Sequence, residues 1–113
     1  MPKRESPIEE FPGHIVLPEF LNVRQVRAFE DAYFGDPNEH KKEGNRVYIS
    51  VEDERMMPVI LDVVKEWHLE GIPEKPSIET IPMTPATTGH ALISWLSGEL
   101  YKMYTGEKRD PNA

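Results

Sequence analysis

Histidine, serine and acidic side chains are the residues of this chain that could do chemistry, and their spacing matches no catalytic or metal-binding motif. The chain has four histidines, His14, His40, His68 and His90. None of them has a second metal ligand at the spacing of a zinc-binding helix such as HExxH. His68 and Glu70 are two residues apart, so on a helix they would face different ways. We interpret the histidines as surface or capping residues and expect no metal site.

Motifs for nucleophilic or phosphate chemistry do not occur in the sequence. The chain has no cysteine, no GxSxG and no glycine-rich phosphate loop. Ser94 and Ser97 would meet a histidine only through the accidents of folding. The acidic run 52–54 fits the start of a helix better than an acid/base pair, because carboxylates stabilise the positive end of a helix dipole. We expect no enzymatic activity and no cofactor.

Length and charge restrict the class of protein further. The 113 residues are enough for a single domain over 1–113, and 20 acidic against 13 basic residues give a net charge of −7. That balance argues against binding to a phosphate backbone, so we expect no nucleic-acid partner. The absence of cysteine fits a reducing cytoplasm. Residues 1–10 lack the apolar run of a signal peptide, and no run is long enough to span a membrane.

The pattern of apolar residues predicts a mainly α, three-helix domain. The first helix, over 22–34, has Asn22 as its N-cap, Gln25 at the capping-box position and Gly35 after its end. The second, over 54–70, has apolar side chains around about 200° of its circumference and should therefore lie in the centre with neighbours on two sides. Pro58 would belong to its first turn.

The third helix is predicted over 85–105, after a proline-rich connection. Thr84 is the expected N-cap, Pro85 the first helical residue and Gly106 the residue beyond the end. The core face of this helix contains six residues within ~120° of arc: Leu92, Ile93, Leu96, Leu100, Met103 and Tyr104. The connection over 72–85 contains four prolines, which favour an extended segment.

Strand signals are weaker than helix signals. Residues 14–17 form a short apolar run that fits an edge strand, and 46–51 alternate apolar and polar side chains. We expect these two segments to pair as a short, hairpin-like two-stranded sheet resting on the helices. Residues 1–10 and 107–113 have little to bury, so both ends are predicted to be flexible.

Three aromatic residues lie off the apolar stripes of the predicted helices: Phe34, Trp95 and Tyr101. One interpretation is a protein-binding surface, since aromatic anchors carry much of the energy at interfaces. The other is that the proline-rich connection covers them. The segments PEKP and PMTP have PxxP spacing, but a rigid linker explains them better because neither has a flanking arginine.

The order of motifs resembles that of a known family. FPG.I.LP at Phe11 leads to LNVRQVRAFEDA, then to P.I...V..W.L.GIPE from Pro58, then to P.TP and ALISWLSGELYKMYTGE. This order is similar to that of the small tail assembly chaperones of long-tailed bacteriophages, over a span from Phe11 to Glu107. The charged segment 36–45 departs from the family pattern. Longer forms of these chaperones arise by ribosomal frameshifting.

The resemblance implies a non-catalytic role in the cytoplasm of the host cell. Such a chaperone coats the apolar, helical tape measure protein, keeps it soluble, and leaves as tail tube subunits polymerise. The partners implied are therefore the tape measure protein and tube subunits, with a homo-oligomer as a further option. Two alternatives remain open: a structural neck or tail component of the virion, and a small adaptor or inhibitor that binds one folded protein.

Overall fold

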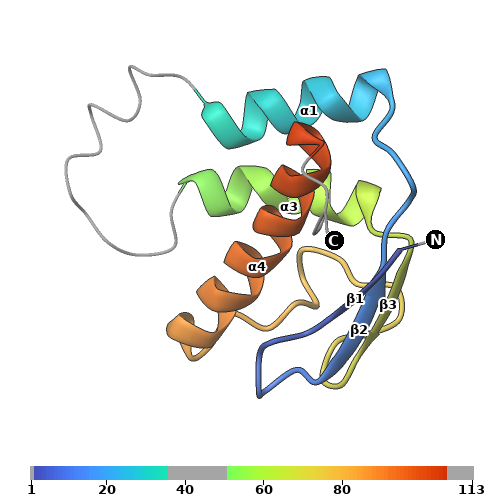
Figure 1. Cartoon of the computed structure of the whole chain (residues 1–113). Coiled ribbons are helices and arrows are strands. Elements are labelled where there is room, and N and C mark those ends of the chain that lie inside the picture. Colours follow the sequence, from blue (N-terminus) through green and yellow to red (C-terminus); the bar gives the residue numbers. More distant parts are fainter. Residues whose placement is uncertain (1, 36–50, 107–113) are drawn as a thin grey trace.

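The computed structural model describes residues 2–35 and 51–106, the side chains of 51–53 excepted. Within these ranges the order of elements is β1 (Lys3–Glu5), β2 (Gly13–Val16), α1 (Val23–Phe34), α3 (Val51–Val63), β3 (Glu66–Leu69) and α4 (Ala86–Thr105). Figure 1 shows α1 and α3 side by side, α4 crossing them, and the sheet beside the helices. The expected helix-rich class is confirmed, with a sheet of three strands.

Helix α1 begins and ends where its capping residues predict. Asn22 Oδ1 accepts a hydrogen bond from the backbone N–H of Gln25 (2.8 Å), and the Asn22 N–H donates to Gln25 Oε1 (3.1 Å). Both halves of the capping box are therefore present. Gly35 follows the helix with a φ of 61°, a conformation that glycine adopts without strain. The prediction of a helix over 22–34 is confirmed to within one residue.

The prediction of a second helix over 54–70 is wrong at its C-terminal end. Helix α3 stops at Val63, and Glu66–Leu69 form strand β3, in which Trp67 and Leu69 are buried while Glu66 and His68 are exposed. Those four residues alternate with period two, which is the pattern of a strand, whereas Trp67 alone continues the apolar stripe of α3 at four residues from Val63. Pairing with β2 decides between the two, since Trp67 stands opposite Ile15. The central placement of α3 is confirmed by its packing against both α1 and α4.

Helix α3 also starts earlier than predicted. Its first residue is Val51, so Pro58 lies inside the helix and not in the first turn. The ring of Pro58 is on the exposed face, away from the buried side chains of Val59 and Ile60. Residues 46–50, most of the second predicted strand, lie outside the described residues, and Val51 is helical.

The sheet involves the N-terminal arm, which contradicts the prediction that residues 1–10 are flexible. Strand β1 pairs with β2 in antiparallel register, with Arg4 opposite Ile15, and β2 pairs on its other side with β3. Strand β2 is therefore the central strand and not an edge strand. Ile8, beyond β1, is 9% exposed and joins the core. The arm orders because its backbone completes the hydrogen bonds of β2. Residues 107–113 lie outside the described residues.

Gly13 makes the pairing of β2 with β3 possible. Its φ is +129°, and a Cβ at this position would collide with the backbone oxygen of His68. Any other residue would therefore force the two strands apart.

Helix α4 matches the third predicted helix to within one residue. Its cap residue is Pro85, one position later than expected, so Thr84 does not act as N-cap and no side chain caps the start. Gly106 ends the helix with a φ of 71° in the left-handed region, as predicted. One cluster of buried apolar residues joins this helix to α1, α3, β2 and β3. No helix in the described part of the chain is long and apolar enough to cross a bilayer.

Candidate protein-binding surface

The sheet brings together two histidines that are far apart in the sequence. His14 and His68 face each other across β2 and β3, with ring centroids 4.7 Å apart, and His68 Nε2 donates to Glu66 Oε1 at 2.8 Å. Sequence spacing could not predict this pair. Across the described residues no group of three or more histidine, cysteine, aspartate or glutamate side chains has an arrangement that could hold a metal ion.

Two of the three predicted surface aromatics lie in one group, and the third does not. Phe34, at the end of α1, and Tyr101, on α4, are 50% and 37% exposed and surround the same buried ring, that of Phe29. Trp95 is half-buried and packs against the core from another face of α4. At about 100° per residue, positions 95 and 101 point roughly 120° apart. Trp95 therefore does not contribute to the same surface.

The aromatic surface, as we call it, consists of Tyr33, Phe34, Tyr101 and Tyr104 over Phe29, which has no exposed area. Centroid distances from Phe29 are 4.9 Å to Tyr33, 5.0 Å to Tyr104, and 6.5 Å to both Phe34 and Tyr101. Tyr33 and Tyr101 stack at 5.2 Å. These distances lie in the favourable range for aromatic pairs, so the rings hold α1 and α4 together and also hold one another in place.

Tyr104 has a polar contact that fixes its ring. Its hydroxyl donates a hydrogen bond of 2.7 Å to Glu30 Oε2 on α1. This bond to a carboxylate stabilises the protonated phenol and raises the pKa of Tyr104 above its ordinary value of 10.0. The hydroxyl therefore remains a donor through the physiological range.

A groove with a volume of about 510 Å³ adjoins the aromatic surface at Tyr104. Most of its apolar lining comes from the connection between β2 and α1 and from α4, and includes Leu17, Phe20, Leu21 and Met103. The side chain of Phe20 is 73% exposed. The volume lies within the ~300–1,000 Å³ typical of ligand sites. Tyr104 belongs both to the aromatic surface and to the lining of the groove, so the two adjoin.

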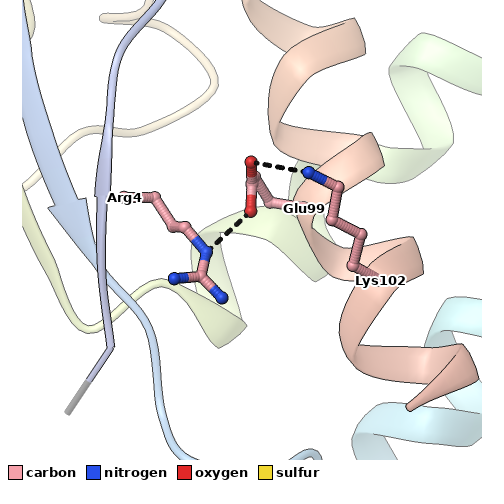
Figure 2. Close-up of polar contacts among 3 residues, drawn as sticks. All are labelled: Arg4, Glu99 and Lys102. Carbon is pink, nitrogen blue, oxygen red and sulfur yellow. Dashed lines mark hydrogen bonds and ion pairs between the residues drawn. The ribbon is translucent and has the colours of Figure 1, made fainter. Parts of the chain in front are cut away.

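Two basic side chains line the groove, and both contact the same buried carboxylate. Glu99, on α4, has a side chain that is 9% exposed, and its Oε1 accepts a hydrogen bond of 2.9 Å from Arg4 Nε on β1. Lys102 Nζ lies 3.6 Å from Glu99 Oε2. Figure 2 shows the carboxylate between the two basic side chains. Arg4 and Lys102 both line the groove.

Sequence reasoning missed most of this surface. The pair Phe29 and Tyr33 has i,i+4 spacing in α1, and Tyr101 and Tyr104 have i,i+3 spacing in α4. These spacings place each pair on one face of its helix, a signal that could have grouped the rings. No local signal links Arg4 to Glu99, which are 95 residues apart.

Comparisons of the chain with protein-family models, with characterised proteins and with solved structures give no match.

Proposed function

We propose that this chain is a non-catalytic tail assembly chaperone that acts in the host cytoplasm, binds apolar helical segments of a tape measure protein and keeps them soluble. The observation that carries the proposal is the aromatic surface, where Phe34 and Tyr101 are exposed beside rings that are already packed. The order of sequence motifs from Phe11 to Glu107, which resembles the tail assembly chaperones, supplies the identity of the partner.

The geometry of the surface suits an apolar helix as partner. Large rings that are held in position lose little conformational entropy when they bind, and exposed aromatic residues are frequent energetic centres of interfaces. An amphipathic helix presents anchors at every third or fourth residue, which could contact the aromatic surface and the adjoining groove in succession. The net charge of −7 would keep an assembly of many copies on one tape measure protein soluble.

The role as a chaperone is tested by where the protein is found during assembly. Mass spectrometry of assembly intermediates and of purified virions should detect the chain with the tape measure protein and not in the finished particle. A fixed copy number in the virion would instead favour a structural neck or tail component.

Binding itself is tested with isolated segments. Overlapping helical segments of a candidate tape measure protein should be soluble when co-expressed with the chain and should aggregate without it. Solubility that does not depend on the chain for any segment would refute the proposal, and tight binding to a single folded protein would favour an adaptor.

A further inference from the structure

The contact of Glu99 with Arg4 and Lys102 leaves hydrogen-bond donors unused at the edge of the groove. Arg4 binds Glu99 through Nε alone, and neither of its terminal nitrogens donates to any acceptor in the described part of the chain. Lys102 Nζ is 3.6 Å from the carboxylate, which is an ion pair but longer than a hydrogen bond. A guanidinium fork and an ammonium group therefore remain able to bind a further acceptor.

The local charge also favours an anion. One carboxylate, Glu99, faces two cations, so the three groups together carry a charge of +1 in a chain whose net charge is −7. Arg4 and Lys102 have side chains that are 34% and 58% exposed, so a ligand can reach both. Glu99 is nearly buried and lies between the two cations.

The remaining charged group that lines the groove makes the site directional. Glu19 is exposed in the connection between β2 and α1, whereas Arg4 is on β1 and Lys102 is on α4. A carboxylate that enters the groove is therefore attracted toward the β1 and α4 side and repelled from the β2–α1 connection. Between these charges lie apolar side chains, among them Leu17, Leu21 and Met103.

From this charge complementarity we infer that the groove recognises an acidic side chain on its protein partner. The occupant is an amphipathic helical segment in which one Asp or Glu adjoins the apolar anchors, and this carboxylate binds Arg4 and Lys102. The inference rests on the proposed function and adds the chemistry that selects among apolar segments. Hydrophobic contact alone would accept any apolar segment. A segment that places a basic or an apolar side chain next to Arg4 and Lys102 would bind more weakly than one that places a carboxylate there.

A displayed library tests the inference. The probe is a set of amphipathic helical peptides of about 18 residues, long enough to form a helix, with a constant apolar stripe and random polar positions. Selection on the whole chain should enrich Asp or Glu at one polar position next to the stripe. In a selected peptide, Glu→Gln at that position should weaken binding by about threefold to tenfold, the range expected for a partly exposed pair with two cations.

Matched variants assign the effect to the groove. Selection on Lys102→Gln should lose most of the acidic preference, and Glu→Gln in the peptide should then change binding by less than about twofold. Lys75→Gln removes the same charge from an exposed site in the connection before α4, outside the groove, and should keep the preference. Circular dichroism of each variant checks that the fold is intact.

Each outcome decides something different. Binders without an acidic preference, or with the same preference on Lys102→Gln, would overturn the inference and leave the proposed function standing. If the library yields no binders at all, both the inference and the proposed function are wrong.

Discussion

The ion pair between Arg4 and Glu99 should hold strand β1 to α4 with a measurable coupling energy. The Glu99 side chain is 9% exposed and accepts a hydrogen bond of 2.9 Å, so the interaction energy of the pair should exceed that of an ion pair on the surface. A hydrogen bond to a charged group contributes about 1.5–3 kcal/mol. Because Arg4 is 34% exposed and Lys102 remains near Glu99, we expect a coupling energy of only about 1–2 kcal/mol.

A double-mutant cycle measures this coupling directly. Arg4→Met keeps most of the aliphatic stem, Glu99→Gln keeps the size of the side chain, and the double variant completes the cycle. The free energy of unfolding of each protein comes from urea denaturation, with the slope against denaturant checked for constancy. A coupling of this size would be a sizeable part of a total stability of about 5–15 kcal/mol.

The chain supplies its own control for the cycle. Arg27 and Asp31 lie 3.9 Å apart on α1, with side chains 78% and 75% exposed, and such i,i+4 pairs contribute about 0.5 kcal/mol or less. If the Arg4–Glu99 coupling is no larger than the Arg27–Asp31 coupling, the account of Glu99 as a buried carboxylate that positions Arg4 is wrong.

Three further predictions concern the fold and the aromatic surface. Trp67→Ala should cost about 3–5 kcal/mol because the side chain is 5% exposed, while Lys65→Ala should cost under about 0.5 kcal/mol, both by chemical denaturation. Deletion of residues 1–10 should lower the melting temperature by about 4 °C or more, since it removes β1 and Ile8, and an unchanged temperature would contradict the pairing. The raised pKa of Tyr104 means that its hydrogen bond to Glu30 contributes fully below pH 10.0 and is lost as pH rises through the raised value. The stability gap between the wild type and Tyr104→Phe should therefore close in alkali, and a gap independent of pH would argue against the bond.

The helices could be predicted from the sequence because their signals are local. Asn22 and Gln25 start α1 and Gly35 ends it, all through contacts within a few residues. Gly106 ends α4 in a similar way. The strands depend on partners that are distant in the chain. Trp67 continues the apolar stripe of α3 at four residues from Val63, so the helix prediction extended over it, and the pairing with β2 places it in a strand instead.

The candidate surface could be predicted only in part, because some of its signals are local and others depend on contacts between distant segments. Phe34 and Tyr101 stand off the apolar stripes of their helices, which sequence reasoning can detect, but their meeting depends on how α1 and α4 pack. Trp95 shows the limit of this reasoning, because it is off the stripe and yet packs against the core. Sequence alone predicts a flexible arm around Arg4, because its partner Glu99 is 95 residues away in the chain.

The most direct test of the central claim is the solubility of an apolar helical segment of the tape measure protein, co-expressed with variants of the aromatic surface. Tyr101→Ala and Phe34→Ala should each weaken binding by ~2 kcal/mol or more and release the segment into the insoluble fraction, while the loss of ring packing lowers stability by about 1–2 kcal/mol and leaves each variant folded. Folded Trp95→Ala protein should keep the segment soluble. Leu96→Ala should lose the segment because the variant itself unfolds, since the Leu96 side chain has no exposed area. If Tyr101→Ala and Phe34→Ala both stay folded and both keep the segment soluble, the aromatic surface does not bind the partner.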